Sequence, residues 1–243
     1  MTDQLTRPVA ADSARFDEPR FFRWSGWSGV IATTLFLVTV AATFAGGPAR
    51  PDGPGEVLAY LSEVAASPAQ SLVYGIAGIA FCVIYVPMLF GAHRLLGGNV
   101  PVWFGTAGLV AGMALLLPAY IVVTLEPGIG DVASRLGVGG ADAAYVMYGT
   151  LSQANLVFVT VGSLLTLCFG PLLWSVESLR NGSIARWLSW TGILTGVSGL
   201  VWFVWFSENG LVMAVLIVNV VASLVYFFGL SAALVRRSGK ASA

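Results

Sequence analysis

The side chains best suited to hold a polar ligand stand inside or at the edge of long apolar stretches. They are Gln153, Asn155, Asn219 and Glu126, and threonines at positions 33, 34, 39 and 43 add hydroxyl groups. An amide in an apolar environment needs a hydrogen-bond partner, which a neighbouring helix or a bound ligand can supply. Both interpretations stay open from the sequence, and bonding between helices is the commoner of the two.

The chain carries few groups for covalent, metal or redox chemistry. Its one histidine, His93, stands beside Arg94, where it is interpreted as a proton shuttle, a cofactor ligand or part of a solvated basic pair. Cys82 and Cys168 lie within apolar runs, and these two thiols with one histidine fall short of a structural zinc site. We expect no metal, cofactor or catalytic residue, since an intramembrane enzyme would have only His93, Cys82, Cys168 or Glu126 to use.

The composition shows which elements must position these residues. Of the 243 residues, 57% are hydrophobic and 10% are charged, whereas soluble domains are roughly one quarter charged. Six windows reach the length of about 20 apolar residues that a membrane-crossing helix needs, and none contains Asp, Glu, Lys or Arg. They are residues 25–46, 70–91, 102–124, 151–174, 187–206 and 210–235. The prediction is an all-α, polytopic bundle of six transmembrane helices over residues 23–237, with polar cytoplasmic tails at 1–22 and 238–243.

The distribution of basic residues predicts the orientation of this bundle. With the N-terminus inside, ten of the twelve Lys and Arg residues fall on the inner side, and only Arg50 and Arg135 fall outside. Cytoplasmic loops collect basic residues, so both termini are expected in the cytoplasm. Arginine-rich, lysine-poor composition suggests a bacterial cell, hence its inner membrane. The first window has an alternative interpretation as a signal peptide cleaved near Thr43-Phe44-Ala45, which its length disfavours.

Two outer connections carry further expectations. Residues 125–150 are interpreted as the longest outer loop, which would place Glu126 and Asp131 on a solvated surface. Residues 56–66 have apolar positions at helical spacing, so they predict a helix on the outer membrane surface or on the bundle.

A tryptophan followed by a glycine five residues later opens each window that starts on the inner side. The pairs are Trp24 with Gly29, Trp103 with Gly108, and Trp187 with Gly192, and Gly112 and Gly196 extend the last two. Indole rings prefer the membrane interface, and glycine lets a neighbouring helix approach closely, so we expect anchoring and packing roles. A ligand site lined by tryptophan is the alternative. The pattern is consistent with three repeated helix pairs, and Pro87 and Pro171 are expected to kink their helices.

The start of the fifth window carries a family resemblance. The residues are Ile184-Ala185-Arg186-Trp187-Leu188-Ser189-Trp190-Thr191-Gly192-Ile193, preceded by Gly170-Pro171-Leu172-Leu173-Trp174. Over residues 145–200 the chain resembles a family of small bacterial membrane proteins catalogued only as a domain of unknown function. Ala185 replaces the proline usual in that family. The resemblance implies a six-helix membrane fold and brings no activity and no catalytic residues.

Two functional hypotheses follow from these features. The leading one is a non-enzymatic accessory, sensing or assembly component, whose partners are the lipid bilayer and another membrane protein. The alternative is a transporter or binder of a small apolar or zwitterionic molecule around Asn155 and Asn219. A zero net charge gives no attraction to nucleic acid, so no nucleic-acid partner is expected. A packed interior with paired amides would favour the first hypothesis, and an open pocket lined by them would favour the second.

Overall fold

The computed structural model describes residues 17–45, 51, 54–136, 138–205 and 209–240. These residues form helices and short turns, and within them there is no strand, which confirms the all-α prediction. The elements are α1 (Glu18–Phe44), α2 (Pro54–Ala66), α3 (Ala69–Ile84), α4 (Val86–Leu95), α5 (Val100–Leu136), α6 (Val138–Leu164), the π-helix η1 (Leu165–Phe169), α7 (Gly170–Asn181), α8 (Arg186–Ser198), the 3₁₀ helix η2 (Gly199–Phe203) and α9 (Gly210–Lys240).

Five helical stretches of the described chain are long and apolar enough to cross a membrane. They are Glu18–Phe44, Ala69–Leu95, Val100–Arg135, Asp142–Asn181 and Gly210–Gly239. The chain is therefore a multi-pass membrane protein. Of the six predicted windows, the one at 187–206 is the exception, because there α8 ends at Ser198 and continues as the short η2.

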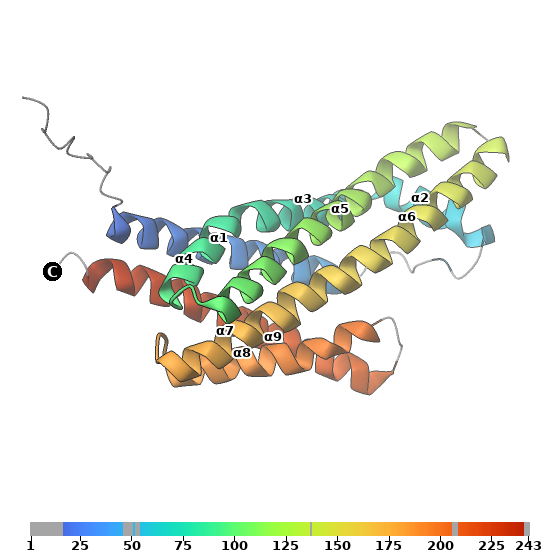
Figure 1. Ribbon diagram of the computed structural model, residues 1–243. Helices are drawn as coiled ribbons and strands as arrows, with labels where there is room; N and C mark the ends of the chain where they lie inside the picture. Colours follow the sequence, from blue (N-terminus) through green and yellow to red (C-terminus); the bar gives the residue numbers. More distant parts are fainter. Residues whose placement is uncertain (1–16, 46–50, 52–53, 137, 206–208, 241–243) are drawn as a thin grey trace, which may run out of the picture.

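The helices run back and forth between two ends of an elongated bundle (Figure 1). The start of α1 packs against the end of α9, since Gly26 lies against Ser231 and Val235. We call this the basic end, because it holds Arg20, Arg23, Arg94, Arg180, Arg186, Arg236 and Arg237. The opposite end, with α2 and the turn from α5 to α6, is called the distal end. The start of α1 and the end of α9 therefore lie side by side at the basic end.

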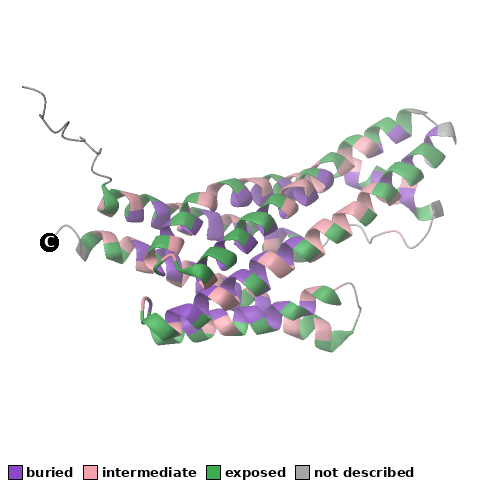
Figure 2. Cartoon of the chain, viewed as in Figure 1, coloured by how far each residue is buried: buried purple, intermediate pink, exposed green. Residues whose placement is uncertain are grey.

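The burial pattern is that of a bundle in lipid. Figure 2 shows buried residues along the facing sides of the helices and exposed ones around the outside. The interior holds large side chains such as Phe81, Tyr85 and Trp174. The outer surface is also apolar, with Ile76 and Val221 more than half exposed. A surface of this kind is stable in contact with hydrocarbon chains.

The prediction of a long outer loop at residues 125–150 is wrong. α5 continues through Pro127 to Leu136, and α6 begins at Val138, so Glu126 and Asp131 stand on a helix. At 37 residues, α5 is about 55 Å long, against a hydrocarbon core of about 30 Å. The distal parts of α5 and α6 therefore project beyond the rest of the bundle (Figure 1). Pro118 and Pro127 both stand inside α5, so proline does not end this helix.

The helix predicted at residues 56–66 is confirmed as α2, and it lies on the bundle. Val57 and Leu61 are buried against Ala133, Ala144 and Tyr148 of the projecting hairpin. Gly130 makes this approach possible, because any Cβ there would collide with the backbone carbonyl of Leu61. The projecting parts of α5 and α6 thus have their own small core, with α2 as its third helix.

Irregular backbone occurs beside both prolines that were predicted to kink their helices. α3 ends at Ile84 and α4 begins at Val86, one residue before Pro87. The π-helix η1 precedes Pro171. Proline lacks the amide proton that would continue the regular ladder, so the preceding turn opens.

The repeated tryptophans and glycines occupy the positions that anchoring and packing require. Trp24, Trp103 and Trp187 lie at the basic end and are 75%, 60% and 59% exposed. The glycines face neighbouring helices: a Cβ at Gly29 would meet Ser231, at Gly108 Phe169, at Gly112 Thr166, at Gly192 Ser175, and at Gly196 Leu172. Whether the pattern records repeated helix pairs stays a prediction.

Candidate functional site

A cavity of about 470 Å³ opens at the distal end of the bundle. Its wall comes from α1, α2, α3, α5, α6, α9 and the segment around η2. The polar and aromatic residues among those that line it are Thr43, Tyr60, Gln70, Ser71, Tyr74, Glu126, Asn155, Trp202 and Trp205. Because six of the described helices and the segment around η2 line the cavity together, it depends on tertiary packing. Its size is within the range of about 300–1,000 Å³ typical of small-molecule sites.

Glu126 and Asn155 provide oxygen atoms in this wall. The Tyr60 hydroxyl donates a hydrogen bond to Glu126 Oε2 at 3.1 Å, which joins α2 to α5. Asn155 Oδ1 is buried and has no hydrogen-bond partner among the described residues. Buried polar atoms in proteins nearly always have a partner, in the protein, in water or in a ligand. Asn155 thus lines the cavity and carries a buried acceptor that the described residues leave unpaired.

Trp202 and Trp205 form an aromatic part of the wall. Their ring centroids are 5.9 Å apart. Trp202 Nε1 donates to Asn219 Oδ1 at 3.0 Å, and Trp205 Nε1 donates to Thr160 Oγ1 at 2.9 Å. Since both indole N–H groups are bonded within the protein, the rings offer the cavity their carbon surface.

Two further donors in the wall are bonded to the backbone of α1. Gln70 Nε2 donates to the Ala42 carbonyl at 2.8 Å, and Thr43 Oγ1 donates to the Thr39 carbonyl at 3.0 Å. These bonds fix the start of α3 against the end of α1. They also use one N–H of the Gln70 amide and the hydroxyl proton of Thr43, which are then not available to a ligand.

A second, smaller cavity of about 80 Å³ lies next to the first and deeper in the bundle. The two share Thr43, Tyr74, Val159 and Trp202. Thr166 lines the deeper cavity, and its buried Oγ1 has no hydrogen-bond partner in the described part of the chain. Polar positions thus continue inward from the larger cavity.

Asn219 is fully buried and bonds to its protein surroundings. Its Nδ2 donates to the carbonyls of Thr195 at 2.8 Å and Leu167 at 3.3 Å, and to Ser198 Oγ at 3.2 Å. Leu167 belongs to the π-helix, and Thr195 and Ser198 stand where α8 gives way to η2. Asn219 therefore connects two irregular helix segments by hydrogen bonds. Its bond to the Trp202 indole also holds that ring in the cavity wall.

The four residues predicted as ligand contacts are thus divided by the structure. Glu126 and Asn155 come together in the cavity wall. Asn219 lies behind that wall, and Gln153 is exposed on another face of α6. The pattern of uncharged amides could not show which face of each helix is turned inward, and the role of these residues as ligand contacts stays a prediction.

The aromatic residues of the site, Tyr60, Tyr74, Trp202 and Trp205, were missed. Attention to tryptophan was confined to the repeated pairs at the basic end. A signal was present, because Trp202 and Trp205 stand three residues apart near the distal end of the fifth window.

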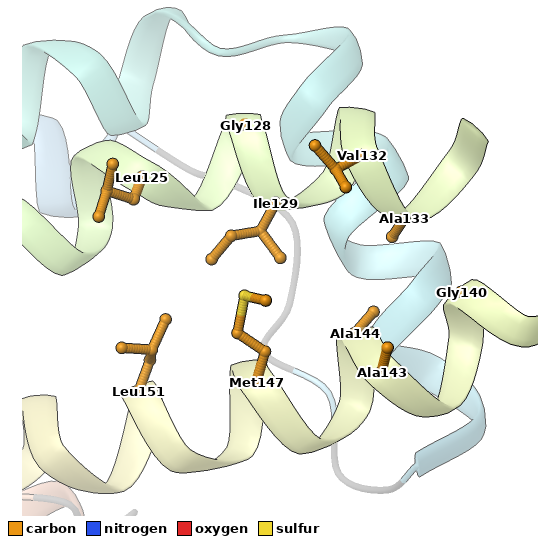
Figure 3. Close-up of a pocket in the computed structure, with 10 residues that line it drawn as sticks. All are labelled: Leu125, Gly128, Ile129, Val132, Ala133, Gly140, Ala143, Ala144, Met147 and Leu151. Carbon is orange, nitrogen blue, oxygen red and sulfur yellow. The ribbon is translucent and has the colours of Figure 1, made fainter. Parts of the chain in front are cut away.

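The apolar cavity of about 300 Å³ between α5 and α6 differs from the polar one (Figure 3). The described residues that line it are small or apolar, and Ile129 faces Met147 across the groove. It lies in the projecting part of the hairpin, and none of these described side chains offers a hydrogen bond or a charge.

Of the four residues that could have supported catalysis, Glu126 lines the distal cavity, and the other three lie apart from it. His93 lies at the basic end, where its Nδ1 is 2.9 Å from Thr106 Oγ1 and its ring packs on Trp103. Cys82 and Cys168 are separate, buried thiols. In the described ranges no cluster of three His, Cys, Asp or Glu residues could hold a metal ion.

A buried carboxylate at the basic end was not singled out from the sequence. Glu177 is 8% exposed, accepts a hydrogen bond from Asn99 Nδ2, and lies 3.7 Å from the Arg180 guanidinium. Asn181 Nδ2 donates to the Leu96 carbonyl at 2.8 Å. These contacts tie the turn after α4 to the end of α7, which is a structural role.

In comparisons with known proteins, no family model, no curated protein and no solved structure matches the chain.

Proposed function

We propose that this chain is a six-crossing membrane protein that binds a small amphipathic molecule in the distal cavity. One observation carries the proposal: the cavity wall holds Asn155, whose buried Oδ1 lacks a partner among the described residues. An unpaired polar atom in an apolar bundle is costly, and a bound molecule that donates a hydrogen bond removes the cost.

The sixth crossing is supported by the length of α8 and η2 together. Thirteen residues of α-helix and five of 3₁₀ helix extend about 30 Å, which is roughly the thickness of the hydrocarbon core. The 3₁₀ turns lengthen the segment without adding residues, and Asn219 supplies hydrogen bonds at the point where the helix type changes.

The orientation is supported by the arginines. Seven described arginines lie at the basic end, and among the described arginines only Arg135 lies at the distal end. By the positive-inside rule the basic end faces the cytoplasm, so the distal cavity opens outside, in a bacterial cell toward the periplasm. The resemblance to a bacterial membrane family is part of the same proposal.

The binding function is preferred over the accessory function because Asn155 lines an open cavity, whereas of the two amides only Asn219 is paired across helices as the accessory function requires. A second function, assembly with another membrane protein, is favoured by the apolar groove in the projecting hairpin. That groove suits an apolar helix or chain, whereas the polar cavity suits a small molecule. A non-enzymatic role stays our expectation for both.

Calorimetric titration of the purified full-length chain in a neutral detergent tests the binding function. The probes are three small aromatic molecules that can each donate a hydrogen bond: benzyl alcohol, benzylammonium and benzamide. We expect at least one to bind, and Val159→Trp, which fills the cavity, to abolish that binding. Val157→Trp on the exposed face of the same helix is the control and should bind normally. Absence of binding by all three, or binding that survives Val159→Trp, would exclude the proposal.

A further inference from the structure

Resting on this binding function, we infer that the ligand is an unbranched apolar chain with a hydrogen-bonding group at each end. The outer group lies at Asn155 in the distal cavity, and the inner group, which is uncharged, lies at Thr166 in the deeper cavity. The two positions share one property, because each carries a buried oxygen that has no hydrogen-bond partner among the described residues.

One face of a single helical stretch carries both positions. α6 continues directly into the π-helix η1, and along this stretch Asn155, Val159, Ser163 and Thr166 follow one another at steps of four, four and three residues. Such steps place side chains on one face of a helix. Asn155 lines the distal cavity, Ser163 and Thr166 line the deeper one, and Val159 lines both. A ligand along this face therefore meets polar groups about 12–16 Å apart, since each helical residue advances about 1.5 Å.

Thr166 differs from other threonines of the bundle. Thr33, Thr106 and Thr195, for example, each donate a hydrogen bond to the carbonyl four residues earlier. This is a common way for a helix to satisfy a buried hydroxyl. Thr166 stands in the π-helix, and its buried Oγ1 has no partner in the described part of the chain. Since buried polar atoms nearly always have a partner, a molecule in the deeper cavity is the one left to provide it.

The boundary between the two cavities suits the apolar middle of such a chain. The residues that line both cavities are Thr43, Tyr74, Val159 and Trp202. The Trp202 indole N–H donates to Asn219 Oδ1 at 3.0 Å, and the Thr43 hydroxyl donates to the Thr39 carbonyl at 3.0 Å. With these protons used inside the protein, Trp202 and Val159 present carbon at the boundary.

The deeper cavity determines the size and charge of the inner group. Its volume of about 80 Å³ corresponds to two or three water-sized groups, at roughly 30 Å³ each. Ser163, Thr166 and Tyr120 are among the hydroxyl-bearing residues that line it, and none of its described lining residues is charged. A charge buried there would lack a compensating partner, whereas a hydroxyl can both donate and accept. A small uncharged group such as a terminal hydroxyl therefore fits.

Calorimetric titration with three chain molecules of one length tests this inference. The probes are decamethylene glycol, with a hydroxyl at each end, decanol, with one, and decamethylenediamine, whose two amines are charged at neutral pH. We expect the glycol to bind the full-length chain about 10-fold more tightly than decanol, because it pairs both buried oxygens. The diamine should bind at least about 10-fold more weakly than the glycol, since one ammonium would enter the uncharged deeper cavity.

Two variants assign the positions of the two ends. Thr166→Val replaces an unpartnered hydroxyl by a methyl group of the same shape, so the fold should be kept and the glycol should lose about 10-fold in affinity. Asn155→Leu should have the same effect on the glycol. Decanol can place its one hydroxyl at either position, so each variant should change its affinity by less than about 3-fold. Thr150→Val, which removes an exposed hydroxyl from the same helix, is the matched control and should change neither affinity.

The outcomes separate this inference from the binding function beneath it. Equal affinity for the glycol and decanol, with both lost in Val159→Trp, would uphold the cavity and overturn the two-ended ligand. A preference for the glycol that survives Thr166→Val would overturn the inner position, and a diamine that binds as tightly as the glycol would overturn its uncharged character. Binding of an aromatic probe without binding of any chain molecule would overturn the inference alone. If all the aromatic and chain probes fail to bind, both the function and the inference fail.

Discussion

Asn219 is the single side chain on which most of the irregular backbone depends. It bonds to the π-helix, to the end of α8 and to the Trp202 indole, and it is fully buried. Removing it would leave the Trp202 indole N–H without its acceptor and would break the bonds between α9 and both irregular segments. The residue predicted as a ligand contact is therefore better understood as a positioning residue for the cavity wall.

Asn219→Ala is expected to lower the free energy of unfolding by roughly 1–3 kcal/mol, because Trp202 Nε1 loses its acceptor and the bonds from Asn219 Nδ2 to α8 and the π-helix are lost. Scanning fluorimetry of the purified protein in detergent measures this as a lower unfolding temperature. Gln153→Ala, at an exposed position of α6, serves as the control and should change stability by less than about 0.5 kcal/mol. An Asn219→Ala protein as stable as the wild type would show that these bonds do not hold the bundle.

The glycines that follow the repeated tryptophans make a second prediction at this scale. A Cβ at Gly192 would overlap Ser175 Oγ and press on the ring of Tyr226, so Gly192→Ala should destabilise the bundle by about 1–3 kcal/mol. Gly149 is the matched control, because it is also helical and nothing lies within 4 Å of an added Cβ. There the same substitution should stabilise by about 0.5–1 kcal/mol. Opposite signs in one unfolding assay are required; equal effects would mean that helix propensity alone decides.

At the scale of elements, the sequence was most informative where composition is extreme. Charge-free apolar windows identified the long helices, because a chain in lipid must bond its backbone internally and a helix does so. The sequence was least informative at residues 125–150, where glycine, proline and charged residues resemble a loop. The helix persists there because α2 packs on it: Leu61 and Val57 bury the apolar face that would otherwise meet water. Such tertiary support is not visible in local spacing.

The docking of α2 on the projecting hairpin can be tested by cysteine labelling. In a background with Cys82→Ala and Cys168→Ala, Leu61→Cys should react slowly with a water-soluble maleimide and Ser62→Cys quickly. The reason is that Leu61 is fully buried and Ser62 is exposed. Leu61→Cys combined with Gly130→Leu should react quickly, because the larger side chain displaces α2. Similar rates at positions 61 and 62 in the first background would contradict the docked arrangement.

At the scale of the whole molecule, the candidate site arises from contacts that no sequence pattern encodes. Asn155 was identified as a polar residue near the outer end of its helix, whereas Glu126 was placed in an outer loop and in fact stands on α5. Their meeting with Tyr60, Trp202 and Trp205 depends on how α2 and η2 turn inward, which is a matter of packing. Gln153, two residues from Asn155, faces outward. The rotation of α6 about its axis therefore decides which of the two side chains lines the cavity.

The central claim is that six helical segments cross the membrane with the distal cavity outside. Single cysteines in the cysteine-free background, labelled in intact cells with a membrane-impermeant maleimide, test it most directly. We expect Ser62→Cys and Asn209→Cys to label in intact cells, and Ala185→Cys and Gly239→Cys to label only after the membrane is permeabilised. If positions 185 and 209 label from the same side, α8 and η2 do not cross, and if positions 62 and 209 are both protected, the cavity faces the cytoplasm.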